Sequence, residues 1–159
     1  MLTPPPRDEN NNVTPHDHAG IANTDGIIRR VSEKQVVTDK FGNRVLSSYV
    51  FKASSSGAYP GKSVDLEALI VEAGIDPKVF VTTPRWCGSI RYTAGQLREL
   101  GLQVGFEPLE EEHPHPANPY HGEVWGDFNK EQQKQLRARA AWYVTMDGVF
   151  ILEQTAKAE

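Results

Sequence analysis

The sequence predicts a single α+β domain with a mostly antiparallel sheet and about three short helices. Short segments that alternate between apolar and polar residues, as half-buried strands do, are interleaved with short segments of helical spacing. They do not follow the regular strand–helix–strand order that a parallel sheet requires. The length of 159 residues suits one domain, and an apolar fraction of 38% is enough for one core.

The first 25 residues differ in composition from the rest of the chain. They contain four prolines and four asparagines but few large apolar side chains. Such a segment cannot bury enough apolar surface to offset the entropy lost on ordering. We therefore expect residues 1–25 to form a disordered tail or a partner-binding arm, residues 26–153 to form the domain, and residues 154–159 to form a short C-terminal tail.

Three strands are predicted at the start of the domain. The first, at residues 26–31, has apolar residues on both sides of Arg29 and Arg30. A second extended segment at 36–38 leads into a turn with Gly and Asn, which adopt positive φ at low cost. Residues 44–51 form the third strand, and a loop rich in Ser, Gly and Pro follows it.

A helix is predicted over residues 63–73. Ser63 can act as its N-cap, and Asp65 and Glu67 lie in the first turn, where the helix dipole favours acids. Apolar residues then recur at helical spacing up to a glycine, which is a common C-terminal stop. A short apolar strand is predicted at residues 79–81.

The chain continues with a second helix and two strands. Thr93 and Gln96 have the spacing of a capping box, which predicts a helix over residues 94–100. Residues 102–106 alternate between apolar and polar side chains, and a further strand is predicted at 121–125.

The last predicted elements are a helix and a hairpin. Asn129 is a suitable N-cap for a polar helix over residues 130–141. Two apolar segments, at 143–146 and 149–152, flank an Asp-Gly pair, which is the strongest short signal for a β-hairpin.

Charge and composition exclude several classes of protein. The net charge is −4, whereas nucleic-acid-binding domains usually carry a basic surface, so general nucleic-acid binding is not expected. The single cysteine, Cys87, excludes an internal disulfide and a multi-cysteine zinc site. No apolar segment approaches the ~18 residues of a membrane span, and the N-terminus lacks the apolar core of a signal peptide. We expect a soluble, cytoplasmic protein that binds no membrane and no cofactor.

The segment 108–126 is the most informative part of the chain. It holds three of the five histidines and four prolines, and it includes three consecutive glutamates. Long irregular loops in compact domains tend to be functional or disordered. His113, His115 and His121, with Glu123, have the alternate spacing that places metal ligands on one side of an extended segment. Histidines in solvated loops are far more often free than ligated, so no bound metal is predicted.

His121 and Glu123 are the predicted catalytic residues. His121 follows a proline-containing turn and begins a predicted strand, where acid–base groups are often held on a rigid scaffold. The alternative, which is the more common role of such a histidine, is that His121 packs at the base of the loop and hydrogen-bonds to the backbone.

Six further residues are candidates for ligand binding. An arginine in the first strand can bind a phosphate or carboxylate, and a serine at a helix N-terminus can help to position it. The six candidates are Arg29, Arg30, Ser48, Ser63, Asp65 and Arg91. The structural alternatives are an ion pair of an inward arginine with Asp65, Glu67 or Glu123 and, for Ser63, a simple N-cap.

Five short motifs together resemble a group of small bacterial proteins of unassigned function. They are RR at 29–30, D-x-x-G-N-R-x-x-S-S-x-x-F at 39–51, S-V-D at 63–65, L-R-E-L-G-L-Q-V at 97–104 and N-P-Y-H-G-E at 118–123. An early arginine, a serine pair on the next strand and a late acid also resemble the ADP-ribosyltransferase arrangement, although the chain lacks that family's Glu-x-Glu or Gln-x-Glu on a late strand. The first resemblance implies no activity, but small domains of this kind often work in multi-component systems, which favours a protein partner.

Two functions are therefore open. The first is a small binding module, or an accessory subunit of a multi-component bacterial system, with a protein partner. The second is an enzyme, ADP-ribosyltransferase-like or hydrolase-like, that acts on a nucleotide or another phosphorylated substrate through Arg29 or Arg30, Ser48 and His121. The positions of these residues in the fold distinguish the two functions. An enzyme needs them to line one pocket, and a binding module does not.

Overall fold

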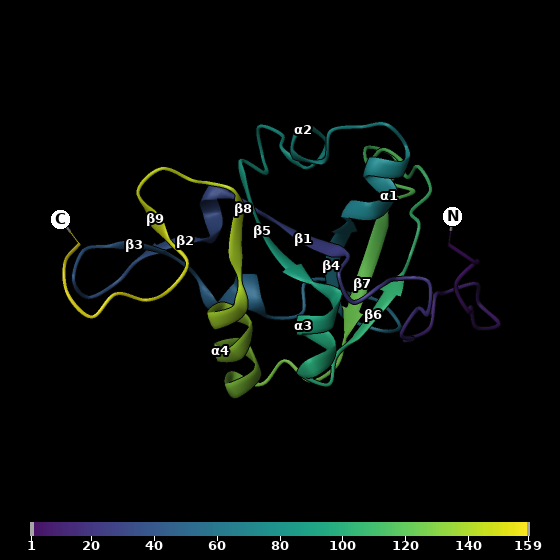
Figure 1. Ribbon diagram of the computed structural model, residues 1–159, viewed down its shortest axis with the longest axis horizontal. Coiled ribbons are helices and arrows are strands. Elements are labelled where there is room, and N and C mark those ends of the chain that lie inside the picture. Colours follow the sequence, from purple (N-terminus) through teal and green to yellow (C-terminus); the bar gives the residue numbers. More distant parts are fainter. Residues whose placement is uncertain (1, 159) are drawn as a thin grey trace.

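The largest part of the fold is a six-stranded antiparallel sheet, which lies near the middle of Figure 1. The computed structural model describes residues 2–158 and places the strands in the order β6-β7-β4-β1-β5-β8. These strands are β1 (Gly26–Val31), β4 (Lys62–Leu66), β5 (Gly88–Thr93), β6 (Gln103–Phe106), β7 (His121–Trp125) and β8 (Ala141–Val144). The α+β class predicted from the sequence is confirmed.

Each face of this sheet is covered by a different pair of helices. On one face, Ile27 and Ile90 belong to the main hydrophobic core, which includes residues of α3 (Ala94–Glu99) and Leu136 of α4 (Lys130–Arg139). On the other face, a smaller apolar cluster joins Ile28 to α1 (Glu67–Glu72) and α2 (Pro77–Val81). The two helix pairs lie above and below the sheet in Figure 1. Because side chains alternate along a strand, Ile27 and Ile28 serve different layers.

A second, three-stranded sheet lies at the end of the molecule that carries the C-terminus (Figure 1). It contains β2 (Val36–Thr38), β3 (Arg44–Leu46) and β9 (Val149–Phe150), and β9 runs parallel to β3. Two 3₁₀ helices, η1 (Glu33–Gln35) and η2 (Ser48–Phe51), flank this sheet in the sequence.

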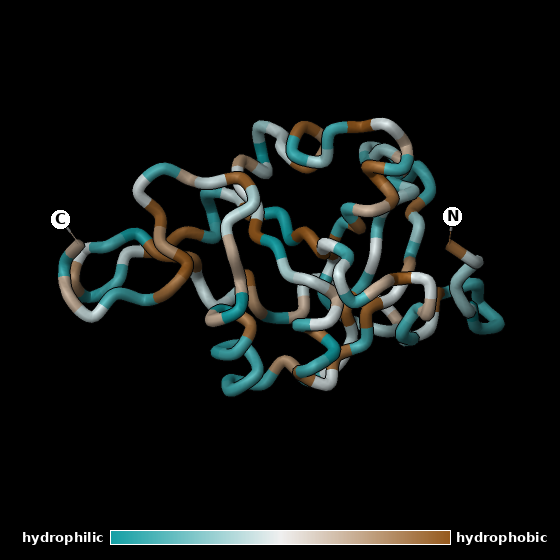
Figure 2. The backbone as a smooth tube through the Cα atoms, in the orientation of Figure 1, coloured by the Kyte–Doolittle hydropathy of each residue, from teal (hydrophilic) through white to brown (hydrophobic). Residues whose placement is uncertain are grey.

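Helix α4 is the most hydrophilic helix of the fold. Figure 2 shows hydrophilic residues over most of its length, and Leu136 is its one buried residue. Arg137 nevertheless contributes to structure, because its guanidinium donates hydrogen bonds of 2.8 Å to the carbonyl oxygens of Leu46 and Ile151. None of the helices within residues 2–158 has the length and apolar composition that crossing a bilayer requires.

Most of the strands and the capped helices lie where the sequence predicts them. Thr93 and Gln96 form the predicted capping box at the start of α3, and Asn129 accepts a hydrogen bond from the Gln132 amide at the start of α4. Strand β5 was not predicted, although Ser89 to Tyr92 alternate in the expected way. Its neighbouring tryptophan, cysteine and arginines hide the alternation.

The prediction that Ser63 caps a helix is wrong. Residues 62–66 form strand β4, and the helix begins only at Glu67. Pairing of β4 with both β1 and β7 outweighs the local helical pattern of this segment. The predicted strand at 79–81 is also wrong, because Asp76 caps helix α2 and Pro77 begins it.

Two predicted extended segments end differently in the structure. The strand predicted at 44–51 stops at Leu46, where Ser47 caps the 3₁₀ helix η2. The Asp-Gly pair makes its turn, with Gly148 at φ 71°. The flanking strands do not pair with each other, however, because β8 joins β5 and β9 joins β3.

The N-terminal arm, residues 2–25, lies against the domain in this structure. His18 donates its backbone N–H to the carbonyl of Val104 at 2.9 Å, and the Asp17 carboxylate accepts the Val104 N–H at 3.0 Å. The arm therefore covers the free edge of β6, and Val13 and Ile21 are buried. The sequence predicts a disordered or partner-binding segment here. In the structure this segment is bonded to the edge of β6 within the same chain.

Candidate functional site

Strands β4 and β7 bring four polar side chains onto one face of the large sheet. Asp65 is paired with His121, and Ser63 is paired with Glu123. Residues opposite each other in an antiparallel pair share a face, as do alternate residues along a strand. Because Asp65 is also paired with Ile28 of β1, this is the face that packs beneath α1 and α2.

A charged network joins β1, β4 and the loop before β7. Arg30 donates two hydrogen bonds to the Asp65 carboxylate, at 2.8 and 3.2 Å. Asn118 donates a third to the same carboxylate at 2.9 Å, and its own side-chain oxygen accepts the Tyr120 N–H. The Arg30 guanidinium also lies 5.4 Å from the centre of the Phe80 ring. The alternative in which an arginine forms a structural ion pair with Asp65 therefore describes Arg30.

His121 is held at both ring nitrogens. Its Nδ1 lies 2.8 Å from the carbonyl oxygen of Glu107, so Nδ1 carries the proton and donates it. Its Nε2 is 3.1 Å from the Ser63 hydroxyl, which can then donate to it. The ring is 6% exposed, and burial lowers the pKa of His121, which favours this neutral tautomer. This geometry matches the alternative in which His121 packs at the base of the loop and hydrogen-bonds to the backbone.

Glu107 and Glu123 place two carboxylates beside His121. One ligand atom from each of the three residues lies within 4.8 Å of the other two. Glu123 is only 2% exposed, and its Oε1 has no hydrogen-bond partner among the described residues. Burial, and then the negative charge of Glu107, raise the pKa of Glu123 to about 8. Two carboxylates this close in a buried place favour a shared proton or a cation between them, and the positive charge of Arg29 offsets only part of their repulsion.

A small pocket of about 130 Å³ opens beside these two carboxylates. It is lined by Glu107, Glu123, the 55–59 loop and the N-terminal arm at Asn12 and Val13. Glu123 is therefore buried but borders a space large enough for several water molecules.

Arg29 leaves β1 on the opposite side from Arg30 and makes no hydrogen bond to the side chains of this network, but its positive charge acts on Glu123 and Asp65. Strands β1 and β4 pair at Ile27 and Ile28 and separate beyond them. There Arg29 donates a 3.3 Å hydrogen bond to the Ser63 carbonyl, while its buried Nε has no partner among residues 2–158. Lys62 is buried nearby and donates to the carbonyls of Val50 and Lys52. Burial lowers the pKa of both cations.

Three groups of predicted site residues lie apart from His121. Ser48 is exposed in η2, and Arg91 is paired with Glu67 through hydrogen bonds of 2.9 and 3.2 Å. His113 and His115 are exposed in the loop and do not belong to the cluster of His121 with the two glutamates. The structure thus brings Arg30, Ser63, Asp65, His121 and Glu123 onto one face of the sheet, and Arg91, which is paired with Ile28, lies on the same face farther from His121.

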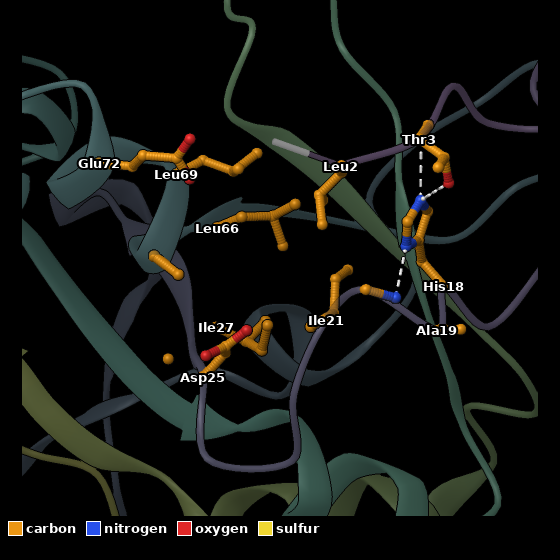
Figure 3. Close-up of a pocket in the computed structure, with 13 residues that line it drawn as sticks. Leu2, Thr3, His18, Ala19, Ile21, Asp25, Ile27, Leu66, Leu69 and Glu72 are labelled. Carbon is orange, nitrogen blue, oxygen red and sulfur yellow. Dashed lines mark hydrogen bonds between the residues drawn. The ribbon is translucent and has the colours of Figure 1, made fainter.

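A larger pocket, of about 450 Å³, lies between the N-terminal arm and α1 (Figure 3). Apolar side chains of Leu2, Ile21, Leu66 and Leu69 surround it. At its edge the His18 ring is already bonded to Thr3 and to the Gly20 N–H. None of the predicted site residues lines it.

Sequence reasoning missed Glu107 and the structural role of Asn118. Glu107 directly follows β6, and its N–H bonds to the His121 carbonyl at 3.0 Å, so it faces the start of β7. The sequence holds a signal for Glu107, because the residues that enter and leave a loop between paired strands must lie close together.

Comparisons with models of protein families, with curated proteins and with solved structures find no match for this chain.

Proposed function

We propose that this chain is a binding module, in the manner of an accessory subunit, and that it presents the acidic loop of residues 109–117 to a basic surface of a protein partner. The observation that carries this proposal is an exposed loop whose base is fixed by hydrogen bonds. Every residue from 109 to 117 is exposed, and Glu110, Glu111 and Glu112 give the segment its negative charge.

The base of the loop is fixed from several directions. Leu109 and Asn118 exchange two backbone hydrogen bonds of 2.9 and 2.8 Å, and Asn118 is bonded to Asp65. Below them, His121 bonds to the Glu107 carbonyl. Figure 1 shows the loop leaving β6 and returning to β7. A loop with a rigid base loses less entropy on binding than a free segment does, which favours recognition.

The charges of the site argue against a phosphorylated ligand. Arg30 is already neutralised by Asp65 and Arg91 by Glu67, while Arg29 is buried among core residues. The groups that border the small pocket are acids, Glu107 and Glu123, which repel a phosphate. The residues required by an enzyme acting on a nucleotide are therefore not gathered in one described pocket, and this favours the binding module.

A capture experiment with matched charge variants tests the proposal. The loop variant is Glu110→Gln with Glu111→Gln and Glu112→Gln. The control replaces the exposed Glu9, Glu131 and Glu153 by Gln and changes the net charge equally. We expect the wild type and the control to retain the same basic partner, and the loop variant to release it. Equal retention by all three proteins would refute the loop as the binding surface.

A second candidate function rests on the contact between Ser63 and His121. A serine hydroxyl on Nε2, with Nδ1 anchored by another group, is the arrangement of a nucleophile, its base and an orienting group. Here the orienting group is a backbone carbonyl, and the Glu107 carboxylate lies 3.6 Å from Nδ1. This arrangement supports a serine hydrolase as the alternative to the binding module.

Labelling with a fluorophosphonate distinguishes the two functions. An activated Ser63 should react at low probe concentration, Ser63→Ala should abolish the adduct, and Ser48→Ala should leave it unchanged because Ser48 is exposed in η2 and makes no hydrogen bond to His121 in the described part of the chain. If the wild type reacts no faster than Ser63→Ala, Ser63 is not a nucleophile.

A further inference from the structure

We propose that Glu107, His121 and Glu123 form a site for one divalent transition-metal ion. This inference is independent of the loop's partner, because it concerns the buried side of the loop base. No ion is present in the structure, and the three residues supply two carboxylates and one imidazole.

The spacing of the three side chains fits a single ion. Zinc and similar ions bind oxygen and nitrogen ligands at about 2.1 Å, so at tetrahedral angles two ligands of one ion lie about 3.4 Å apart. With either ring nitrogen counted for His121, one ligand atom from each residue lies within 4.8 Å of the other two. An approach of about 1.4 Å or less, by flexible glutamate side chains on a fixed strand pair, would complete the site.

The buried carboxylate of Glu123 supplies independent support. Its Oε1 has no hydrogen-bond partner among the described residues, although the residue is 2% exposed. Buried acceptors without partners are rare and usually mark a missing water or ion. Glu107 lies beside Glu123 on the same pocket, so a cation there would serve both carboxylates at once.

His121 is oriented as a metal ligand is. Metal-bound histidines usually donate the other ring N–H to a carbonyl or carboxylate, which fixes the tautomer. Nδ1 of His121 donates to the Glu107 carbonyl and lies 3.6 Å from the Glu107 carboxylate, which leaves Nε2 as the nitrogen with a free lone pair for an ion. The hydroxyl of Ser63, 3.1 Å from Nε2, is a neutral partner that an ion can displace by rotation about one bond.

The ligand set selects the class of ion. An imidazole nitrogen with two carboxylates suits Mn²⁺, Fe²⁺ or Zn²⁺, whereas Mg²⁺ and Ca²⁺ prefer oxygen ligands alone. Three protein ligands leave coordination positions open, and the pocket of about 130 Å³ gives them room for water. The site thus resembles an open metal centre rather than a closed structural one.

Exposed loop histidines are the rival explanation for any metal that the chain retains. His113 and His115 are exposed and can bind zinc without the glutamates. The experiment therefore needs variants that remove each set of ligands separately.

Calorimetric titration of the untagged full chain with Mn²⁺ and with Zn²⁺, after chelator treatment, tests the proposal. We expect one ion per chain in the wild type, and affinity weakened about tenfold or more in Glu107→Gln and in Glu123→Gln. The exposed control Glu110→Gln and the double variant His113→Ala/His115→Ala should bind as the wild type does. Circular dichroism checks that each variant is folded, and the half-buried Glu107 keeps the test valid if Glu123→Gln does not fold.

Two results would overturn the site. One is the absence of binding by the wild type with both ions, which would leave the two carboxylates sharing a proton. The other is wild-type affinity in both glutamine variants together with its loss in the double histidine variant, which would assign the metal to the exposed loop.

Discussion

At the scale of single residues, the structure is unusual in the cations it buries. Lys62 is 1% exposed, lies near the rings of Phe51 and Phe128 and donates to the Val50 and Lys52 carbonyls, with no carboxylate paired to it among residues 2–158. Burial lowers its pKa well below the ordinary value. The unfolded chain keeps the ordinary pKa, about 10.4, so between the two values it binds a proton that the folded chain does not. Stability should therefore rise with pH across this interval, and Lys62 should destabilise the fold most at pH values below its lowered pKa in the folded state.

Replacing Lys62 by methionine should remove this pH dependence. We expect Lys62→Met to be more stable than the wild type by about 1 kcal/mol at pH 7, because removal of a buried charge outweighs two lost hydrogen bonds. The difference should shrink towards pH 10. Urea denaturation at several pH values measures it, with the exposed Lys130→Met as control. A variant that is less stable at every pH by a constant amount would show that Lys62 stabilises as a hydrogen-bond donor.

The sequence predicts which side of a strand a residue faces, because side chains alternate along the strand. It does not predict which residue of the neighbouring strand lies beside it. The sequence predicts that Arg29 and Arg30 face opposite sides of a strand, and in the structure Arg30 joins Asp65 while Arg29 reaches the Ser63 carbonyl. The neighbour of Arg30 on β4 could not be derived, because register across 35 residues depends on tertiary packing.

At the scale of elements, the loop between β6 and β7 depends on one side chain. Asn118 connects the loop to Asp65 and to the Tyr120 N–H. We expect Asn118→Ala to raise hydrogen exchange at the Leu109 and Asn118 amides at least about tenfold, which corresponds to about 1.4 kcal/mol of local stability. Exchange at the Val124 amide in β7 should be unchanged.

The exposed tip of the same loop provides the control for this measurement. Pro116→Ala should leave exchange at the loop base unaltered, because Pro116 is exposed and the two bridging hydrogen bonds join Leu109 to Asn118. If Asn118→Ala and Pro116→Ala give the same exchange rates, the polar network does not hold the loop.

The sequence predicts correctly the helix starts that depend on hydrogen bonds between neighbouring residues. It does not predict the structure that depends on strand pairing with distant segments. The capping box at Thr93 and the Asn129 cap each fix a helix start through bonds within four residues. The segment at 63–66 has the same local helical pattern but becomes a strand, since two neighbouring strands satisfy its backbone. The Asp-Gly turn likewise forms, while its two strands join different sheets.

At the scale of the whole molecule, the N-terminal arm completes the sheet. Ile21 is 4% exposed within the main core, and the His16 ring lies against Trp125 with centroids 5.3 Å apart. Gly105 permits this approach, because a Cβ there would overlap the Trp125 ring. The composition of the arm indicated disorder because few of its residues are apolar, but the few that are apolar lie in buried positions.

Deletion of residues 1–24 tests the structural role of the arm. Loss of Ile21 alone removes about 2 kcal/mol of apolar burial, so the melting temperature should fall by at least about 5 °C. Ile21→Ala should reproduce part of the loss, whereas Val37→Ala, at a side chain 46% exposed, should have little effect. A shift of only a few degrees on deletion would support the disordered tail that the sequence predicts.

The central claim is that the loop of residues 109–117 contacts a basic protein partner, and site-specific photo-crosslinking in the native host tests it most directly. A photoreactive residue at His113 lies on the exposed loop, and one at Lys134, within the hydrophilic helix α4, serves as control. We predict an adduct from position 113 that disappears when Glu110, Glu111 and Glu112 are replaced by Gln, and none from position 134. An adduct from position 134 alone, or one from 113 that survives the charge replacement, would contradict the account.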